Sequence, residues 1–535
     1  MTILRMAGER RFSSRRCVYN RGHIASGAAV VGLSALAVLV PTAGRADTFR
    51  IQPTFSITET LTNNVNLSPS GSAQGDLVTQ LTPGITINEV GARVSLTGNV
   101  SVPILLYAKT GAENNTAYVQ ANLLGNAEVI EKFFYVEAAV DAAPQYFTPF
   151  GAQPQGLANA TQNRYQIADY RVSAYVKGGH SGDIEYLVRN DSTWTTLNST
   201  PLAVDNSYTN QTLATVGKQA PQLGWLLEYN RTSVTFSSQP PLLTELGRLR
   251  LSHSPDPQVT LSVSGGYETN DYTFTHSSDA IYGVGAKWFP TERTKVEGWW
   301  EHRFFGSSYL FDFSHRTPLS VWLVNASRNI TSYPQQVGSL QAGVAVSSLL
   351  NQLFLSSLPD PAQRQAAVDQ YISNHGLPTT LSSPVNLYTQ LITLQTSASA
   401  SVGLLGARNS IFLTAFYLRQ QPITAAGNDI PGFIAGSNDN TQVGANIVWT
   451  HSLTPSLTLV TSGTINRTES NLPASSLGFQ ATTRQGYATM GLSTQLSPNT
   501  SVSGGIRYQV LHADPGAGSG YNEAAIFASL FYTFR

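Results

Sequence analysis

The stretch that decides the fold is the last one, residues 521–535, which reads YNEAAIFASLFYTFR. Every second side chain in it belongs to an apolar row, made of Ile526, Ala528, Leu530, Tyr532 and Phe534. Successive side chains of a β-strand point to opposite faces, so this row lies on one face. The segment therefore predicts a strand with a wholly apolar face, close to the end of the chain.

A final strand with an apolar outer row and a penultimate aromatic residue is typical of bacterial outer-membrane β-barrels. In such a barrel Leu530, Tyr532 and Phe534 would act as the signal for membrane insertion. Closure of the barrel pairs every backbone N–H and C=O group, while the apolar face meets lipid. The alternative is the edge strand of a soluble β-sandwich.

The beginning of the chain predicts export. Six arginines between Arg5 and Arg21 precede an apolar run of small residues, 24–40, and Gly44-Arg45-Ala46 provides the small residues that signal peptidase requires. We therefore expect residues 1–46 to be a cleaved signal peptide and residues 47–535 to be the mature barrel. A membrane anchor is the alternative, but the run is short and rich in glycine and alanine.

Composition narrows the class of the mature chain. Its precursor has a single cysteine, Cys17, within the predicted signal peptide, so the mature protein has no disulfide and no thiolate site. Removing residues 1–46, with their seven arginines and Glu9, leaves 25 basic and 31 acidic residues, a net charge near −6. No basic stripe stands out, so nucleic acid is not an expected partner. No apolar stretch of the mature chain is long enough for a membrane helix, so a membrane role requires a barrel.

Alternating segments of about 10 residues or more recur along the mature chain and predict about 22 strands. The connections alternate in length. Tight turns such as 88–91, 254–257 and 496–499 contain Gly, Pro, Asn or Asp. Most of the other connections are longer, among them 61–75, 146–162, 332–385 and 421–437. Bacterial barrels have short periplasmic turns and long extracellular loops. The predicted fold class is an all-β, transmembrane, antiparallel up-and-down β-barrel with one helical extracellular loop insertion.

That insertion is 332–385. Asp360 is placed to cap a helix, Pro361 suits its first turn, and Gly376 ends it. An amphipathic pattern over 339–357 predicts a helix before it. The insertion is either a decoration that packs on the rim or a plug or lid that folds over the pore mouth.

Charges segregate to one face of the predicted strands. In 292–305, Lys295, Glu297, Trp299, Glu301 and Arg303 alternate with Val296, Gly298, Trp300, His302 and Phe304. A charge that faces lipid at the bilayer midplane costs about 2–4 kcal/mol, so the charged face should line the lumen. The other residues that we expect to line the lumen are Asp169, Arg171, Lys177, Glu185, Arg189, Arg248, Arg250 and Arg507.

A lumen with both signs of charge has two interpretations. The charges form an ion-pair network that braces a wide barrel, or they form a polar path for a charged or sugar-like solute, with Trp299 as a stacking surface. Aromatic residues such as Trp225, Trp288 and Tyr532 are expected to form girdles at the membrane interfaces.

The segment 54–107 resembles the N-terminus of a family of outer-membrane proteins associated with PEP-CTERM/exosortase systems. The matching residues are Asn63, Asn64, Val65, Leu67, Asp76, Val78, Pro83, Gly84 and Ile85. Asn63 stands where an aspartate is expected, so a Ca²⁺ role for that loop is not supported. The resemblance implies a large barrel without an assigned activity, in the outer membrane of a Gram-negative bacterium, and it suggests a role in exopolysaccharide export.

No enzyme motif is evident. Ser314 and His315 are adjacent on a strand and point to opposite faces, so they cannot form a nucleophile–base pair, although Ser252 with His276 across strands stays open. No catalytic residue, cofactor site or metal site is predicted. The expected partners are outer-membrane lipid, the barrel-insertion machinery and export components of the envelope. Three functions remain open: a passive channel or accessory for exopolysaccharide export, a general or substrate-specific uptake porin, and a non-conducting structural or binding barrel.

Overall fold

The computed structural model describes residues 50–534, apart from 147, 180–182, 199–205, 221, 237–240, 273–274, 333–345, 356, 376, 378–380, 382–383, 386–391, 424–438, 472–480 and 515–519. The predicted signal peptide, residues 1–46, lies outside the described residues. So does the segment 339–345, which begins the first predicted helix.

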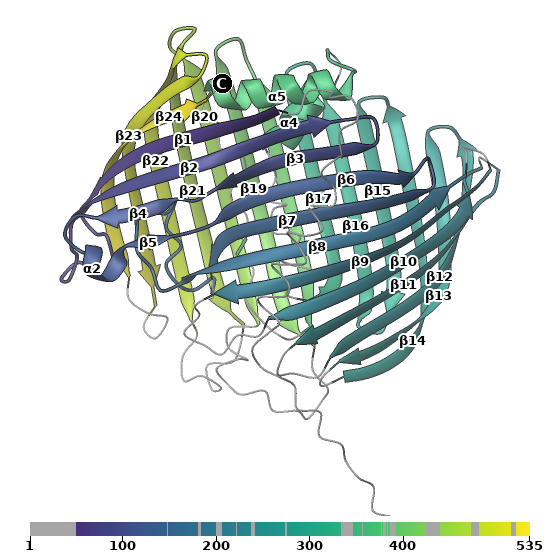
Figure 1. Cartoon of the computed structure of the whole chain (residues 1–535). Helices are drawn as coiled ribbons and strands as arrows, with labels where there is room; N and C mark the ends of the chain where they lie inside the picture. The colour runs from purple at the N-terminus through teal and green to yellow at the C-terminus, as the bar shows by residue number, and fades with distance from the viewer. Residues whose placement is uncertain are drawn as a thin grey trace, which may run out of the picture.

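The strands form one closed antiparallel barrel (Figure 1). The last strand, β24 (Tyr521–Thr533), closes the ring against the first, β1 (Arg50–Thr62), with Leu530 opposite Ile57. Two positions in the ring are each filled by two consecutive segments: β3 with β4, and β5 with β6. The 24 segments therefore make 22 barrel strands, and the predicted fold class is confirmed.

The segments between β1 and β24 follow one another around the ring in chain order. They are β2 (Asp76–Val90), β3 (Val94–Ser101), β4 (Ile104–Tyr107), β5 (Thr116–Ala117), β6 (Gln120–Ile130), β7 (Phe134–Tyr146), β8 (Arg164–Gly178), β9 (Ile184–Asn198), β10 (Ser207–Lys218), β11 (Gly224–Phe236), β12 (Leu242–Asp256), β13 (Val259–Tyr272), β14 (Thr275–Thr291), β15 (Thr294–Arg303), β16 (Gly306–Arg316), β17 (Ser320–Thr331), β18 (Thr393–Leu405), β19 (Asn409–Pro422), β20 (Asn440–Ser452), β21 (Leu457–Ser470), β22 (Thr482–Ser497) and β23 (Thr500–Ala513).

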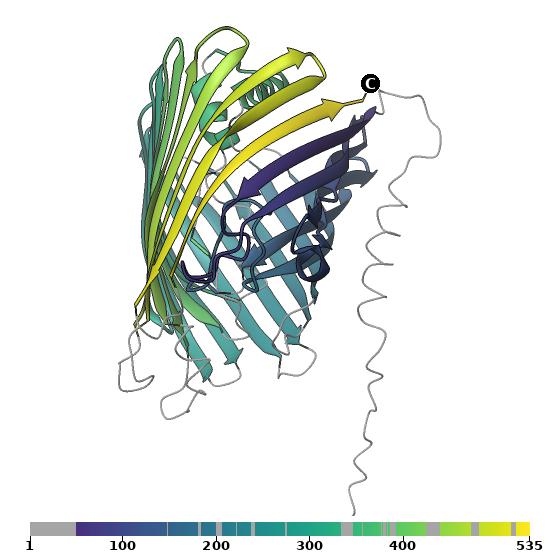
Figure 2. The same cartoon turned by 90° about the vertical axis from the view of Figure 1, so that its left-hand side faces the viewer.

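The two rims of the barrel differ in the length of their connections. At one rim the turns are tight, as between β12 and β13 or between β22 and β23, and both β1 and β24 have their terminal ends there (Figure 2). The long connections, including 63–75, 148–163 and the insertion after β17, leave from the opposite rim. We call these the short-turn rim and the long-loop rim. In bacterial barrels the first is periplasmic and the second extracellular.

The outer face of the barrel carries many exposed apolar side chains, and the pair Arg231–Glu245 lies on it toward the long-loop ends of β11 and β12. On β12, Leu249 and Leu251 are exposed on the outside, whereas Arg248 and Arg250 line the interior. Aromatic side chains gather on the outer face close to the short-turn rim, among them Trp288 and Trp322. This distribution suits hydrocarbon on one side and water on the other.

The described helices are α2 (Gly111–Asn114), α4 (Val346–Phe354) and α5 (Pro361–His375). Asp360 caps α5, because its Oδ1 accepts a hydrogen bond of 2.8 Å from the Gln363 N–H. None of the described helices has the length and apolar character needed to cross a membrane.

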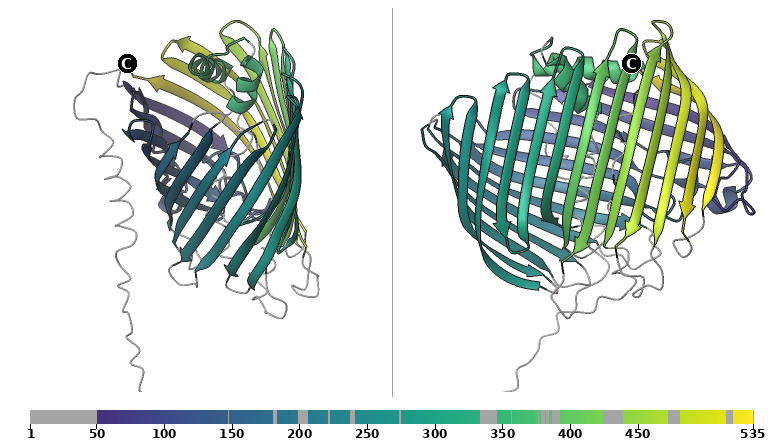
Figure 3. Two further views of the ribbon diagram at one scale, coloured as in Figure 1. Left: turned by 90° about the vertical axis from the view of Figure 1, so that its right-hand side faces the viewer. Right: turned by 180° about the vertical axis from the view of Figure 1, so that it is seen from behind.

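The α4–α5 hairpin lies inside the ring of strands at the short-turn rim (Figures 2 and 3). Leu349 and Leu350 of α4 are fully buried against wall residues that include Val321 and Phe412. These two wall residues stand at the short-turn ends of β17 and β19. The insertion leaves the wall at the long-loop rim, yet its helices dock at the opposite rim. The hairpin thus fills part of the lumen and does not cover the long-loop mouth as a lid would.

One hydrogen bond fixes the second helix to the wall. The Tyr371 hydroxyl of α5 bonds to the Ser410 hydroxyl of β19. Burial raises the pKa of Tyr371 above its ordinary value, so the hydroxyl stays protonated at neutral pH.

The loop 148–163 also folds inward, against the strands near the closing seam. Asn159, which is fully buried, donates to Glu523 of β24 at 3.2 Å and accepts from Arg507 of β23 at 2.9 Å. Glu523 also accepts from Thr62 of β1 at 2.7 Å and from Arg507 at 2.8 Å. We call Thr62, Asn159, Arg507 and Glu523 the seam cluster. It joins the first strand, the last two strands and the inward loop.

Candidate functional site

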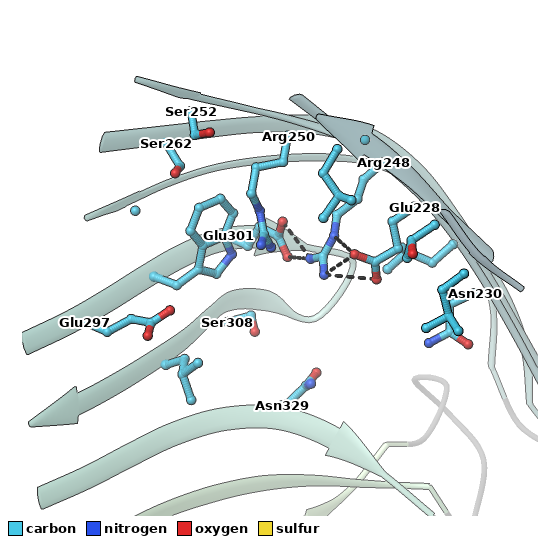
Figure 4. Close-up of a pocket in the computed structure, with 18 of the residues that line it drawn as sticks. Glu228, Asn230, Arg248, Arg250, Ser252, Ser262, Glu297, Glu301, Ser308 and Asn329 are labelled. Carbon is cyan, nitrogen blue, oxygen red and sulfur yellow. Dashed lines mark hydrogen bonds and ion pairs between the residues drawn. The ribbon is translucent and has the colours of Figure 1, made fainter. Parts of the chain in front are cut away.

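A cavity of about 1620 Å³ runs along the inner wall formed by β7–β17, away from the seam cluster. Its lining reaches the short-turn rim at Lys132 and Lys218, and the long-loop rim at Tyr272 and Ser332. The α4–α5 hairpin and the loop 148–163 leave this side of the lumen open. The cavity is the candidate functional site, and part of it is shown in Figure 4.

An apolar cluster stands at the long-loop end of the cavity. Val234 and Leu242 contribute from β11 and β12, and Ile392 contributes from the far side, next to β18. The other members are Phe236 and Tyr272, with Phe304, Ile330 and Ile423 packed against them. Because these side chains come from strands on both sides of the cavity, they narrow its long-loop mouth.

Arg248 organises the charges at the centre of the cavity wall. Its guanidinium bonds to both oxygens of Glu228 on β11, at 3.0–3.1 Å, and to both oxygens of Glu301 on β15, at 2.9–3.0 Å (Figure 4). Ser264 of β13 also donates to Glu301, at 2.9 Å. Bidentate pairs of this kind are the strong form of the ion pair, so Arg248 is held rigidly, and its two carboxylates together carry one negative charge more than it offsets.

Further pairs extend along β15. Glu297 accepts from Lys287 of β14 and from Lys295, each at 2.9 Å. Arg303 bonds to the fully buried Glu268 of β13. The predicted row Lys295, Glu297, Trp299, Glu301 and Arg303 thus shares one face of β15 and points inward. Glu297, Glu301 and Arg303 pair with neighbouring strands, and Lys295 pairs with Glu297 of its own strand.

Arg250 differs from the other cations of this wall. Its guanidinium lies 4.2 Å from the centroid of the Trp299 ring, a cation–π contact. Within the described part of the chain it makes no ion pair and no hydrogen bond. The predicted stacking surface of Trp299 therefore has a cation on one of its faces.

A second charged group lies on the inner face of β7–β9. Glu137 accepts from Arg171 at 3.1 Å and from Arg189 at 2.8 Å, and Arg189 also pairs with Asp191 at 2.7 Å. Asp169 is buried on the same face of β8.

Two further predicted lumen residues line the cavity near its short-turn end. Glu185 lies on the cavity lining, and Lys177 contacts the Tyr135 ring at 4.4 Å from its centroid. Arg507 is in the seam cluster instead of the cavity. The structure thus brings most of the predicted lumen residues to one wall.

Sequence reasoning missed the partners of these charged residues: Glu137, Glu228, Glu268, Lys287 and Glu523. On β11 a signal was available, because Glu228 and Asn230 alternate with the exposed apolar side chains Leu227 and Tyr229.

The residues of the predicted insertion signal stand at the end of β24. Leu530, Tyr532 and Phe534 are all exposed on the outer face, where a terminal apolar row meets lipid. Tyr532 and Phe534 pack edge-to-face, with ring centroids 4.8 Å apart.

Residues that carry the family resemblance support the first loop. Asn64 is fully buried; its Oδ1 accepts from the Ser68 N–H at 2.9 Å, and its Nδ2 donates to the Asn522 carbonyl at 2.9 Å. Asp76 accepts from the Thr110 hydroxyl at 2.7 Å and from its N–H at 2.9 Å. Asn64 and Asp76 both hydrogen-bond to groups of the protein, and these bonds hold the first loop in place at the long-loop rim.

Neither of the two serine–histidine pairs considered from the sequence comes together in the structure. Ser252 is opposite Ser262 toward the short-turn end, whereas His276 pairs with Asp271 at the long-loop end, so the two are far apart. Ser314 is opposite Lys295, and the neighbouring His315 bonds to Thr294 at 2.8 Å. Among the described residues no group of three His, Cys, Asp or Glu side chains could hold a metal ion.

No family model and no curated protein matches this sequence. Solved structures with a similar architecture include the siderophore receptor PirA from Acinetobacter baumannii, with 10% identity and a TM-score of 0.45 over 92% of this chain and 81% of that chain. PirA from Pseudomonas aeruginosa has 10% identity and a TM-score of 0.42 over 92% and 82%. OccK1 (OpdK) from Pseudomonas aeruginosa has 8% identity and a TM-score of 0.36 over 90% and 99%. Similarity at this level gives no information on substrate.

Proposed function

We propose that this protein is a passive channel for small hydrophilic solutes in the outer membrane of a Gram-negative bacterium. The observation that carries the proposal is the charged cavity that reaches both rims inside an apolar cylinder. Ion pairs alone could brace the wall, but a bracing network does not require open space between the rims. Solute would diffuse along the β7–β17 wall, between the apolar cluster at one mouth and the α4–α5 hairpin beside the other.

The test is conductance across a planar lipid bilayer. The wild-type barrel is expected to conduct, and a variant that lacks residues 333–384 is expected to conduct more, because the hairpin occupies lumen. The double variant Leu349→Asn with Leu350→Asn keeps the chain length. It places polar side chains where α4 packs on the wall, so it should undock the hairpin and raise conductance as well. Gln370→Ala, on the exposed side of α5, is the control and should not change it.

Three outcomes of the conductance measurement test the proposed channel. Conductance that rises in both hairpin variants supports the channel. Absence of current in the wild type and in both variants overturns it and favours a structural or binding barrel. A wild-type current that neither hairpin variant changes shows that the hairpin does not limit the pore.

Export of exopolysaccharide, which the family resemblance implies, remains a prediction. Deletion of the gene is then expected to reduce capsule or matrix on the cell surface. The passive channel is the better-supported function, because it rests on the cavity that reaches both rims, whereas export of a polysaccharide rests on the resemblance alone.

A further inference from the structure

The inner face of β7–β9 supports a statement that does not depend on the channel function. We propose that Asp141 of β7, Asp169 of β8 and Thr195 of β9 bind a Ca²⁺ ion on the lumen side of the barrel wall. The argument uses the register of these strands, the balance of charge on their inner face and the buried oxygen atoms that lack a partner.

The three residues form one row across the wall. Asp141 is directly opposite Asp169, and Asp169 is directly opposite Thr195. Asp141 follows Glu137 by four residues on β7 and therefore shares its inner face. Opposite side chains on one face have Cβ atoms about 4.5–5.5 Å apart, so their terminal oxygens can meet at a single ion. Asn122 of β6 continues the row, and its Nδ2 donates to Oδ1 of Asp141 at 2.7 Å.

This face has more carboxylates than cations. Within the described part of β7–β9, the charged side chains on the inner face are Glu137, Asp141, Asp169, Glu185 and Asp191 against Arg171, Lys177 and Arg189. Two negative charges are thus in excess. Arg171 acts on Asp169 from two residues along β8, but it also pairs with Glu137 and offsets only one charge. Like charges directly opposite one another destabilise a sheet, and one divalent cation matches the excess.

Buried oxygen atoms of the row have no hydrogen-bond partner. Asp169 is 8% exposed and Thr195 is 1% exposed. Thr195 lies close to Asp169. Among the described residues, however, neither Oδ1 of Asp169 nor Oγ1 of Thr195 makes a hydrogen bond. Burial of an unsatisfied polar atom is costly, and burial of a charge costs more, so a cation that contacts both oxygens removes both costs.

The available ligands suit Ca²⁺. This ion takes about six to eight oxygen ligands in variable geometry, whereas Mg²⁺ demands a near-ideal octahedron and retains several waters. Side chains held on three adjacent strands of a rigid wall favour the more tolerant ion. Asp141 is only partly buried, so water from the lumen can complete the shell. With two carboxylates the set is smaller than a group of three acidic or histidine ligands, and we expect a dissociation constant of about 10⁻⁴–10⁻³ M.

The experiment measures Ca²⁺ binding to the mature barrel, refolded into detergent without lipopolysaccharide and freed of metal with EDTA. Isothermal titration with CaCl₂ and with MgCl₂ compares the wild type with Asp169→Asn, Asp141→Asn and Thr195→Val. Asp183→Asn is the matched control, because Asp183 is exposed at the turn between β8 and β9. One unit charge about 4 Å from a divalent ion is worth more than a factor of ten even in water, so each aspartate variant should weaken Ca²⁺ binding at least about tenfold. Thr195→Val should weaken it less, and Asp183→Asn should not change it.

Urea unfolding in EDTA and in excess Ca²⁺ provides a second readout. In EDTA, Asp169→Asn should be at least as stable as the wild type, because it removes a repulsion. In Ca²⁺ the wild type should be the more stable of the two, because the ion binds the folded state. A purely structural role of Asp169 would give the same order in both conditions.

Three results would each overturn the inference. Both aspartate variants bind Ca²⁺ like the wild type, or Mg²⁺ binds the wild type as tightly as Ca²⁺ does, or the order of the stabilities does not depend on Ca²⁺. None of these measurements depends on conductance, so they are independent of the test of the channel.

Discussion

Replacing Glu523 by alanine tests the seam cluster. Glu523 is fully buried, and it accepts hydrogen bonds from Thr62, Asn159 and Arg507, so its removal leaves a buried guanidinium without its carboxylate. Removal of one partner from a buried ion pair costs about 3–5 kcal/mol. We expect Glu523→Ala to lower the free energy of unfolding of the barrel by about that amount, measured by urea titration in detergent micelles.

The same change should release the inward loop, because Asn159 loses its acceptor on β24. Limited proteolysis should then cut within 148–163 faster than in the wild type. Glu131→Ala is the control: Glu131 pairs with Arg93, and both side chains are about 60% exposed, so the loss should be at most about 1 kcal/mol. A cost for Glu523→Ala no larger than that of the control, with an unchanged cleavage rate, would refute the account of the seam.

Other predictions concern lipid contact, docking and assembly. Ile506→Lys places a charge on the exposed outer face in the middle of β23 and should cost about 2–4 kcal/mol of unfolding free energy in lipid vesicles, whereas Ser503→Lys, on the inner face of the same strand, should cost much less. Leu350→Ala removes a fully buried side chain from α4 and should weaken docking by about 2–5 kcal/mol, seen as a higher conductance with an unchanged unfolding temperature of the barrel. Deletion of residues 534–535 should reduce the amount of heat-modifiable, folded barrel in outer-membrane fractions; equal yields would contradict the assigned insertion signal.

The barrel could be predicted from the sequence because its two faces meet different solvents. Water inside and lipid outside impose a period of two, and β15 shows it with Glu297, Trp299 and Glu301 inside and Trp300 outside. The alternation over 91–107 and over 116–128 predicts one strand for each segment. The structure divides each of them in two, but pairs the pieces as single positions in the ring.

The position of the hairpin could not be predicted in the same way. An amphipathic pattern shows that α4 has an apolar partner but not which part of the wall provides it. One signal was present: on β19 the inner face carries Phe412 and Phe416, while Leu413 is apolar on the outer face as well. A strand that is apolar on both faces requires other residues to pack against its inner face, which would otherwise contact water.

The geometry of the candidate site depends on the register of neighbouring strands. The alternation of polar and apolar residues does not determine that register. Arg250 and Trp299 were both placed in the lumen, but their contact requires β12–β15 to be aligned so that Gly285 lies beside the indole. Turn residues fix such an alignment only approximately, because a turn that is one residue longer shifts each partner along the neighbouring strand.

Because α4 and α5 belong to the same chain as the wall on which they dock, their return to that wall is an intramolecular event. Two parts of one chain meet at an effective concentration of about 1 mM, so a contact with a dissociation constant of about 1 μM keeps them together about 99.9% of the time. The hairpin therefore does not need a strong interface to occupy its position. A modest and reversible contact is enough, and a hairpin that has undocked stays attached to the barrel.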